Sequence, residues 1–370
     1  MARVAVAMSG GVDSAVAAML LVEAGHEVVG FTMNLWPHWL PEDDAGSGCC
    51  GVGAVEDARA VARVLGIRHY VLNLRQAFEE AVIRPFALEY ARGRTPNPCA
   101  ACNRFIKFDL LLEKASGLGM DYLATGHYAR VRHESDRTLL LRAADRAKDQ
   151  SYVLYALTQQ ALRRLLFPVG ERTKAEVRAL ARARGLPVAE KPDSQEICFV
   201  PRGHYTNVVA HFAPEALRPG PILDTRGRRI GTHAGIARYT LGQRRGLGLS
   251  AGKPLYVVAI DPERNALVVG EEEDLLATEV ELEQVSWVLG APPDVCFHAT
   301  VRLRHGAPDL SARVHCLGDG VRIRFLTPQR ATSPGQVACI YRDEVVLGGG
   351  IVRSVRTVGS EKFQQVGVFA

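Results

Sequence analysis

The sequence predicts an α/β protein with a Rossmann-like first domain, a small central β domain and a C-terminal β-barrel. Two observations carry this prediction. Short apolar runs alternate with helical segments up to about residue 204, as in a parallel sheet covered by helices on both faces. From about residue 219 onward, short runs that alternate apolar and polar residues recur between Gly, Pro and Asp, which is typical of small β domains and barrels.

The elements of the first domain follow one another in a regular β-α order. We expect strands over residues 3–7, 28–33, 69–74 and 121–125. We expect helices over residues 15–24, 52–65, 76–91 and 103–116. Gly25 and Gly66 follow the first two of these helices, as C-terminal glycines commonly do. Because helices separate the strands, we expect the strands to pair in parallel.

The second half of the chain predicts antiparallel strands. A turn at residues 261–265 separates apolar runs at 256–260 and 266–269, and residues 321–325 alternate with a period of two. We place domain boundaries near residues 205 and 285. The chain of 370 residues then divides into 1–204, 205–284 and 285–370.

The composition excludes several classes of protein. Hydrophobic residues make up 47% of the chain and charged residues 23%, which excludes a disordered or fibrous protein. No run of 18 apolar residues and no signal-peptide pattern is present, so we expect a cytoplasmic protein without membrane association. The net charge of +5 is weak support for a polyanionic partner.

The first β-α junction carries the most specific motif, Ser-Gly-Gly-Val-Asp-Ser at residues 9–14. A helix N-terminus presents unpaired N–H groups and partial positive charge, and glycines let the backbone approach an anion. Asp13 suits a magnesium-bound anion or a helix cap. The spacing is neither that of Walker A nor GxGxxG. We therefore expect a phosphate-binding turn.

The eight cysteines fall into two groups. Cys99 and Cys102 form a C-x-x-C pair where a loop enters a helix, and Cys198 lies far along the chain. Three interpretations stay open: a pair of reactive thiols, of which one carries a persulfide and the other resolves it; a metal or iron–sulfur site; and inert buried cysteines. We expect Cys296, Cys316 and Cys339, which lie in apolar strand-like runs, to be small buried hydrophobes.

Six segments together resemble one family. The turn at residues 9–14 resembles the PP-loop, the pyrophosphate-binding loop of the adenine nucleotide α-hydrolase fold. With it, in order, come NPCAACN (97–103), ATGHYAR (124–130), KDQSY (148–152), KPDSQEICFV (191–200) and YTLGQRRGL (239–247). This set is similar to the MnmA-type tRNA-specific 2-thiouridylases over nearly the whole chain.

The resemblance implies a reaction and a set of residues. ATP, with Mg²⁺, would adenylate O2 of uridine 34 of a tRNA, and sulfur would replace that oxygen to give 2-thiouridine, AMP and pyrophosphate. The resemblance makes Cys102 the nucleophile and Cys198 the persulfide carrier, with persulfide and disulfide chemistry between them. The sulfur would come from a persulfide or sulfide donor, such as a cysteine desulfurase or a sulfur carrier. The implied ATP-binding residues are Ala7, Met8, Ser9, Gly10, Gly11, Val12, Asp13, Ser14, Met33 and Gly126. The implied tRNA-contacting residues are Asn97, Pro98, Cys99, His127, Lys148, Asp149, Gln150, Arg304, His305 and Gln336.

Cys99 departs from the more familiar family pattern, which has Asp at that position. A C-x-x-C form with a third cysteine resembles thiolases that hold a [4Fe-4S] cluster with one open iron, in which Cys99, Cys102 and Cys198 would be ligands. Two other functions remain as alternatives: a PP-loop enzyme with a small-molecule substrate, and an RNA-binding protein without enzymatic activity.

A basic segment supports an RNA partner. Residues 217–246 hold seven arginines against the single acid Asp224, with Tyr239 and Gln243 among them. Such a segment is typical of a surface that contacts a phosphate backbone. We therefore expect the central domain to contact tRNA.

Overall fold

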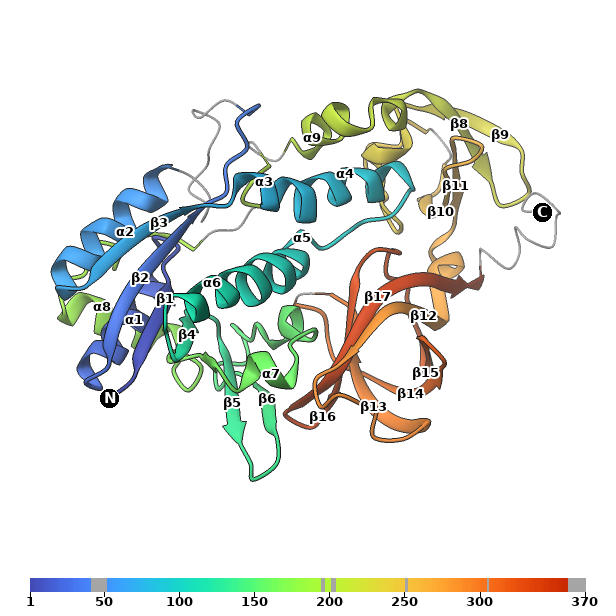
Figure 1. The fold of residues 1–370 in the computed structure, drawn as a ribbon. Coiled ribbons are helices and arrows are strands. Elements are labelled where there is room, and N and C mark those ends of the chain that lie inside the picture. The colour runs from blue at the N-terminus through green and yellow to red at the C-terminus, as the bar shows by residue number, and fades with distance from the viewer. Residues whose placement is uncertain (41–51, 194–196, 201–203, 250–251, 305, 359–370) are drawn as a thin grey trace.

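The structure is a computed structural model that describes residues 1–40, 52–193, 197–200, 204–249, 252–304 and 306–358. Figure 1 shows three parts: a parallel sheet flanked by helices, a small sheet beside helix α9 (Tyr205–Phe212), and a barrel of long strands. The predicted fold class, a Rossmann-like domain followed by a small domain and a β-barrel, is confirmed.

The first part is built on a parallel sheet. Its strands, in the order in which they pair, are β3 (Arg68–Asn73), β2 (Glu27–Asn34), β1 (Arg3–Ala7), β4 (Tyr122–Thr125) and β7 (Leu165–Leu166). All neighbouring pairs are parallel. The order reverses direction at β1, and ligands of open α/β sheets bind at such switch points beyond the carboxyl ends of the strands. The turn after β1 lies at this position.

Helices cover both faces of this sheet. On one face are α1 (Val12–Glu23), α2 (Val52–Leu65) and α8 (Lys174–Ala183), whose apolar residues share a buried cluster with Val4 and Val6 of β1. The opposite face packs on a helix that begins at Pro98 and ends at Gly117. This helix consists of α5 (Pro98–Ala101), a π-helical stretch (Cys102–Leu111) and α6 (Leu112–Gly117). The remaining helices of this part are α3 (Arg75–Phe78), a π-helical turn (Glu79–Ile83), α4 (Arg84–Ala91), a 3₁₀ turn (Ser151–Leu154) and α7 (Gln159–Leu162).

The central part follows α9 (Tyr205–Phe212). Its four strands pair in the order β10 (Tyr256–Asp261), β11 (Ala266–Gly270), β8 (Gly220–Asp224) and β9 (Arg229–His233). Three 3₁₀ turns lie at Pro214–Leu217, Ile236–Arg238 and Glu272–Leu275. The predicted pair of strands around residues 261–265 is the antiparallel pair β10–β11.

The last part is a closed barrel. Its strands are β12 (Leu276–Trp287), β15 (Gly320–Arg330), β14 (Leu310–Leu317), β13 (Cys296–Arg302), β16 (Val337–Arg342) and β17 (Val345–Thr357), and β17 pairs back with β12. The expected domain boundary at residue 285 falls inside β12. We propose that the third domain begins before Leu276, since a barrel strand belongs to one cooperative unit.

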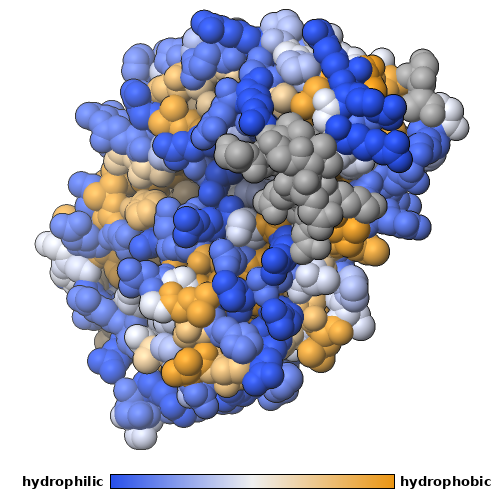
Figure 2. Space-filling view, turned by 90° about the vertical axis from the view of Figure 1, so that its right-hand side faces the viewer, coloured by the Kyte–Doolittle hydropathy of each residue, from blue (hydrophilic) through white to orange (hydrophobic). Residues whose placement is uncertain are grey.

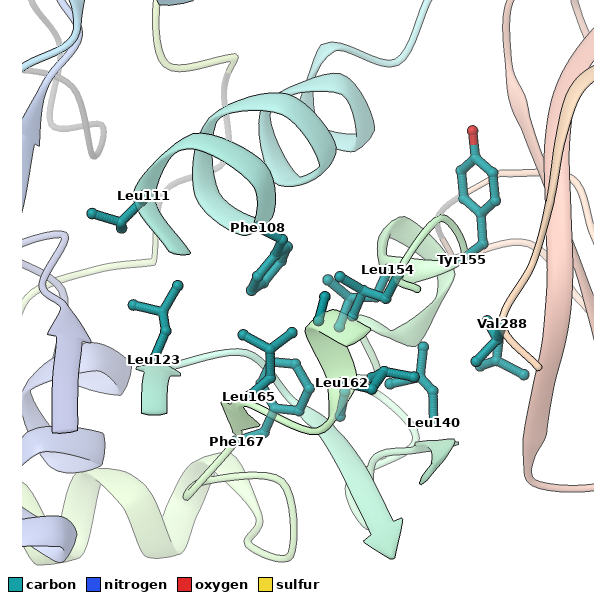
Figure 3. Close-up of a cluster of buried hydrophobic side chains, with 14 of the residues drawn as sticks. Phe108, Leu111, Leu123, Leu140, Leu154, Tyr155, Leu162, Leu165, Phe167 and Val288 are labelled. Atoms are coloured by element: carbon teal, nitrogen blue, oxygen red, sulfur yellow. The ribbon is translucent and has the colours of Figure 1, made fainter. Parts of the chain in front are cut away.

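The barrel is joined to the first part by a hairpin and by a shared core. Strands β5 (Ala129–His133) and β6 (Thr138–Arg142) extend the barrel sheet through pairing of β6 with β17. Figure 3 shows the core beside this junction, where Phe108 and Leu123 of the first part lie in the same cluster as Val288. The first part and the barrel are therefore held together by a common buried apolar core.

One prediction about the barrel cysteines was only partly right. Cys339 is fully buried, and burial raises its pKa to about 12, so it behaves as a small hydrophobe. Cys296 and Cys316 are only partly buried. The guanidinium Nε of Arg313 donates to Cys296 Sγ over 3.0 Å. The prediction was wrong for these two because both lie near the end of a strand pair, where the barrel wall leaves them partly open to water.

Candidate active site

The turn between β1 and α1 is shaped by glycine and serine. Gly10 has φ +67°, and a Cβ there would lie 2.4 Å from the carbonyl oxygen of Ala54 in α2. Ser14 closes the turn, because its Oγ accepts from the N–H of Ser9 over 3.1 Å and donates to Gly11 O over 3.0 Å. Gly126, after β4, packs on the same turn, and a Cβ there would lie 2.5 Å from Ser14 N. Only glycine fits at these two positions.

Asp13 does not cap α1. The N-cap residue is Gly11, and no side chain caps the helix. The carboxylate of Asp13 instead accepts from Lys174 Nζ at 2.7 and 2.8 Å and from the Tyr128 hydroxyl at 2.8 Å. The helix-cap interpretation of Asp13 is therefore wrong. Burial, followed by the charge and the hydrogen bond of Asp13, raises the pKa of Tyr128, which stays a donor.

A second carboxylate shares the same lysine. Asp193 lies 2.8 Å from Lys174 Nζ and 2.8 Å from Lys148 Nζ, and it accepts from Arg178 over 2.9 Å. Burial alone would raise the pKa of Asp193, but the hydrogen bonds from the two lysines outweigh it and lower the pKa to about 2. Lys191 Nζ lies close by, 3.1 Å from Gly10 O. The turn is therefore surrounded by cations held in place by carboxylates.

These groups line a cavity of about 540 Å³, within the range usual for small-molecule sites. Among the predicted site residues, those in its lining are Ala7, Met8, Ser9, Gly11, Val12, Asp13, Ser14, Met33, Pro98, Cys99, Cys102, Gly126, His127, Lys148, Gln150 and Cys198. Gly10, Asn97, Asp149, Arg304 and Gln336 are not in the lining. His305 lies outside the described residues.

The three cysteines of interest all line this cavity. Cys99 and Cys102 lie in the first turns of the helix that begins at Pro98, and Asn97 caps that helix by accepting from Ala100 N over 3.2 Å. Cys99 is exposed, Cys102 is 7% exposed and Cys198 is partly buried. The part of the chain that the structure describes contains no group of three or more His, Cys, Asp or Glu side chains that could hold a metal ion.

His127 lines the cavity as a neutral side chain. Its Nδ1 lies 2.8 Å from Thr125 Oγ1. Burial, followed by the nearby charge of Lys107, lowers the pKa of His127 well below its usual value. At neutral pH the imidazole therefore offers hydrogen bonds rather than a positive charge.

The predicted residues outside the lining have other neighbours. The Asp149 carboxylate has no exposed surface, so in this arrangement it does not face a ligand, contrary to the contact expected from the sequence. Gln336 in the barrel donates to Thr95 O over 2.7 Å and so supports the loop before Asn97. Arg304 is exposed.

Several charged or polar residues that line the cavity were not assigned a role from the sequence, among them Tyr128, Lys174, Lys191 and Asp193. Tyr128, Lys191 and Asp193 belong to motifs quoted above, so a signal existed for them. Lys174 had none: it follows the N-cap residue Thr173 of α8, and 161 positions separate it from Asp13. Only the packing of α8 beside α1 brings the two charges together.

Comparison with known proteins finds similar domains in the same order along the chain. Three family models match in order: the tRNA methyl transferase HUP domain over residues 2–202, the tRNA methyl transferase PRC-barrel domain over 206–271, and the aminomethyltransferase beta-barrel domain over 277–352. Among solved structures, a 4-thiouridine synthetase–RNA complex with bound ATP aligns over 58% of this chain and 51% of that one, at 19% identity and a TM-score of 0.36.

Curated relatives match almost end to end. The tRNA-specific 2-thiouridylase MnmA of Moorella thermoacetica is 51% identical over 356 residues, which cover 95% of this chain and 100% of that protein. The protein of the same name from Chloroflexus aggregans is 53% identical over 355 residues, which cover 95% of this chain and 98% of that one. The chain belongs to the family of MnmA tRNA-specific 2-thiouridylases.

Proposed function

We propose that this protein is an ATP-dependent tRNA 2-thiouridylase that converts uridine 34 to 2-thiouridine. The observation that carries the proposal is one cavity that joins a phosphate-binding turn to three cysteines. The turn supplies the means to activate an oxygen, and the cysteines supply sulfur to replace it. Membership of a family whose curated members bear the name tRNA-specific 2-thiouridylase supports the choice of substrate.

The activation step uses the turn and the lysines around it. The proposed ATP site comprises the turn of residues 9–14, with Ala7, Met8, Met33 and Gly126 beside it. Backbone N–H groups of the turn and the ammonium groups of Lys174 and Lys191 would hold the phosphates. Mg²⁺ commonly binds one or two protein carboxylates and completes its shell with phosphate and water, and Asp13 is the carboxylate at the turn suited to it. O2 of the uridine would attack the α-phosphorus, and pyrophosphate would leave.

The sulfur step uses two thiols. The outer sulfur of a persulfide on Cys198 would attack C2 of the activated uridine, and AMP would leave. The Cys102 thiolate would then attack Sγ of Cys198, which releases the sulfur on the base and forms a Cys102–Cys198 disulfide. A thiol reductant would restore both cysteines, and a persulfide donor would reload Cys198. Two such steps replace one difficult displacement.

A cluster-based route is the second candidate, because Cys99 lines the cavity together with Cys102 and Cys198. The described residues, as they are placed, form no group of three side chains that could hold a metal ion, so this route requires the three cysteines to move closer together. In that version the three cysteines would hold a [4Fe-4S] cluster, and sulfide would replace the oxygen. Iron and acid-labile sulfide in protein purified without oxygen separate the two routes. About four of each per chain, lost in Cys99→Ala, would establish the cluster route; iron-free protein that thiolates tRNA would establish the thiol route.

The tRNA surface extends beyond the cavity. All seven arginines of residues 217–246 are exposed. Figure 2 views the molecule from the side where Figure 1 places β8, β9 and the end of the barrel, and this side is largely hydrophilic. Exposed arginines on a polar face suit a phosphate backbone. We infer that these arginines, with Arg304 in the barrel, contact the tRNA body while His127, Lys148 and Gln150 lie near the target base.

The first test is tRNA-dependent release of AMP. Wild-type protein with ATP, Mg²⁺ and a tRNA that carries uridine 34 should form AMP faster than without tRNA. Asp13→Ala should reduce that rate by about a hundredfold or more, because it removes a charge from the site of phosphate transfer. AMP formation that ignores tRNA would instead support a small-molecule substrate, and absence of AMP would support an RNA-binding protein without activity.

A further inference from the structure

Asp149 is a buried carboxylate between two residues that line the cavity. Its Oδ1 accepts from Ala143 N over 3.0 Å and from Ser151 N over 3.2 Å, and its Oδ2 accepts from Ser151 Oγ over 3.1 Å. These bonds close the segment that follows β6 into a loop. Its neighbours Lys148 and Gln150 face the cavity, whereas Asp149 points away from it. The conformation of this carboxylate therefore fixes where its two neighbours lie.

The closer of the two arginines that pair with Asp149 comes from the barrel. Arg302, at the end of β13, donates to Asp149 Oδ2 over 3.1 Å and to Asp309 over 2.9 Å, and its side chain is 14% exposed. Burial alone would lower the pKa of Arg302, but Tyr341, Asp309 and Asp149 together raise it, so the guanidinium stays charged. A buried carboxylate is tolerated only with such a partner.

The same interface contains a second arginine and an aromatic ring. The guanidinium of Arg142, in β6, lies 3.6 Å from the centre of the Tyr341 ring, pairs with Asp309 over 2.9 Å and lies 4.0 Å from Asp149 Oδ2. The Tyr341 hydroxyl lies 3.2 Å from Ser151 Oγ. Residues of the first part and of the barrel thus alternate in one buried polar network. A buried polar network holds its side chains in a single geometry when every polar group in it has a hydrogen-bond partner.

The network reaches the phosphate-binding turn through Gln150. The backbone N–H of Gln150 donates to Tyr128 O over 2.8 Å, and its side-chain oxygen accepts from Tyr128 N over 2.9 Å. Tyr128 in turn donates its hydroxyl to Asp13. Hydrogen bonds, together with the peptide bond between Asp149 and Gln150, therefore join Arg302 in the barrel to Asp13 in the turn.

We propose that Arg302 and Asp149 are positioning residues through which the C-terminal barrel sets the geometry of the active-site loop and of Tyr128. The proposal rests on the proposed function for its catalytic consequence, although not for its structural one. Arginine suits this role better than lysine, because its planar fork spans Asp149 and Asp309 at once. The barrel would thereby act as part of the catalytic unit as well as a surface for RNA.

The test compares Arg302→Met and Arg302→Lys with Arg324→Met. Arg324 is an exposed barrel arginine that pairs with Glu279 and has no contact with this network. Hydrogen exchange of the free protein should show faster exchange across residues 143–151 in Arg302→Met, and unchanged exchange there in Arg324→Met. Arg302→Lys should restore part of the protection, because it keeps the charge.

The kinetic readout is the kcat for tRNA-dependent AMP formation. Arg302→Met should lower kcat about tenfold to a hundredfold, the size of effect expected from a small misplacement of catalytic groups. The KM for ATP and the Kd for tRNA should change less than about threefold, because Arg302 contacts neither ligand in this proposal. A loss of tRNA affinity with kcat unchanged would overturn the positioning role and make Arg302 an RNA contact.

A double variant distinguishes a loss of positioning from misfolding of Arg302→Met. In Asp149→Asn/Arg302→Met no buried charge is left unpaired, so this protein should fold and should be better protected over residues 143–151 than Arg302→Met alone. Equal protection in wild type and Arg302→Met would overturn the proposal whatever the enzyme does with tRNA. The variants could also show the expected differences in hydrogen exchange while the wild-type protein forms no AMP. That result would contradict the proposed function but would still support the coupling between the barrel and the loop.

Discussion

Lys174 sits between two carboxylates, Asp13 and Asp193, and this arrangement has a chemical consequence. Phosphate oxygens are acceptors of the same kind as carboxylate oxygens, so a bound triphosphate would compete with both acids for this ammonium group. The ion pairs hold the lysine at the turn before ATP arrives. In the proposed activation step, the phosphates would therefore meet charges that already neutralise one another and need little rearrangement.

His127 makes the acid stability of the protein predictable. Its pKa in the folded protein lies below the unfolded value near 6.5, so below that pH the unfolded chain binds a proton that the native protein does not. The free energy of unfolding should therefore fall as the pH drops below about 6.5, with up to ~1.4 kcal/mol per pH unit from this one group.

Urea unfolding at a series of pH values measures that slope. Between about pH 6 and 5, His127→Gln should show a smaller slope of unfolding free energy against pH, by the amount that corresponds to about one proton. The control is His133→Gln, because His133 in β5 is exposed, and this variant should keep the wild-type slope. Identical slopes for wild type and His127→Gln would show that His127 takes up its proton normally in the folded protein.

Single residues of the site differ in how far the sequence predicts them. The turn of residues 9–14 is contiguous, and its chemistry follows from local backbone physics, so it was predicted. Lys174 was not, because its role exists only once α8 packs beside α1. A tRNA contact of Asp149 was implied by the resemblance of the motif at residues 148–152, but a motif does not show which way each side chain of a loop points, and this carboxylate is buried.

The turn after β1 packs directly against the backbone of helix α2, and Gly10 is the residue at this contact. Gly10 and Gly25 both have positive φ, but a Cβ at Gly10 would meet the backbone of Ala54, whereas a Cβ at Gly25 would meet nothing within 4 Å. Gly25→Ala should cost about 1 kcal/mol of folding free energy from its backbone conformation alone. Gly10→Ala should cost about 2 kcal/mol more, because α2 must move.

Urea unfolding of the two variants, together with ATP binding, tests this fit between turn and helix. Gly10→Ala should also weaken ATP binding, whereas Gly25→Ala should leave it unchanged, because Gly25 follows the far end of α1. Equal losses of stability in both variants would mean that the contact with α2 is easily relieved and does not shape the turn.

Element boundaries were predicted best where the signals are local. The helix expected at residues 52–65 matches α2 in full, because its periodic apolar face and Gly66 mark both ends. The helix expected from residue 103 begins at Pro98, since Asn97 caps it and Pro98 occupies its first turn. The Pro-rich stretch before it suggested a loop, although proline at the start of a helix is favourable.

At the scale of the whole molecule, three parts predicted as separate are joined more closely than the sequence indicates. The barrel was expected from alternating strands, but its pairing with the hairpin β5–β6 was not, since strand partners distant in sequence leave no local signal. That pairing brings Arg302 and Tyr341 against Asp149 and Ser151. The barrel therefore completes the loop that lines the cavity.

The proposed transfer of sulfur to uridine 34 can be measured on the tRNA itself. The most direct measurement is nucleoside mass spectrometry of tRNA after incubation with the protein, ATP, Mg²⁺ and a persulfide donor. Wild type should produce 2-thiouridine at position 34, and so should Cys296→Ser, whose cysteine lies in the barrel outside the cavity. Cys198→Ser should bind the tRNA as wild type does and yield no 2-thiouridine. Unmodified uridine 34 from wild-type protein, or full thiolation by Cys198→Ser, would contradict the account.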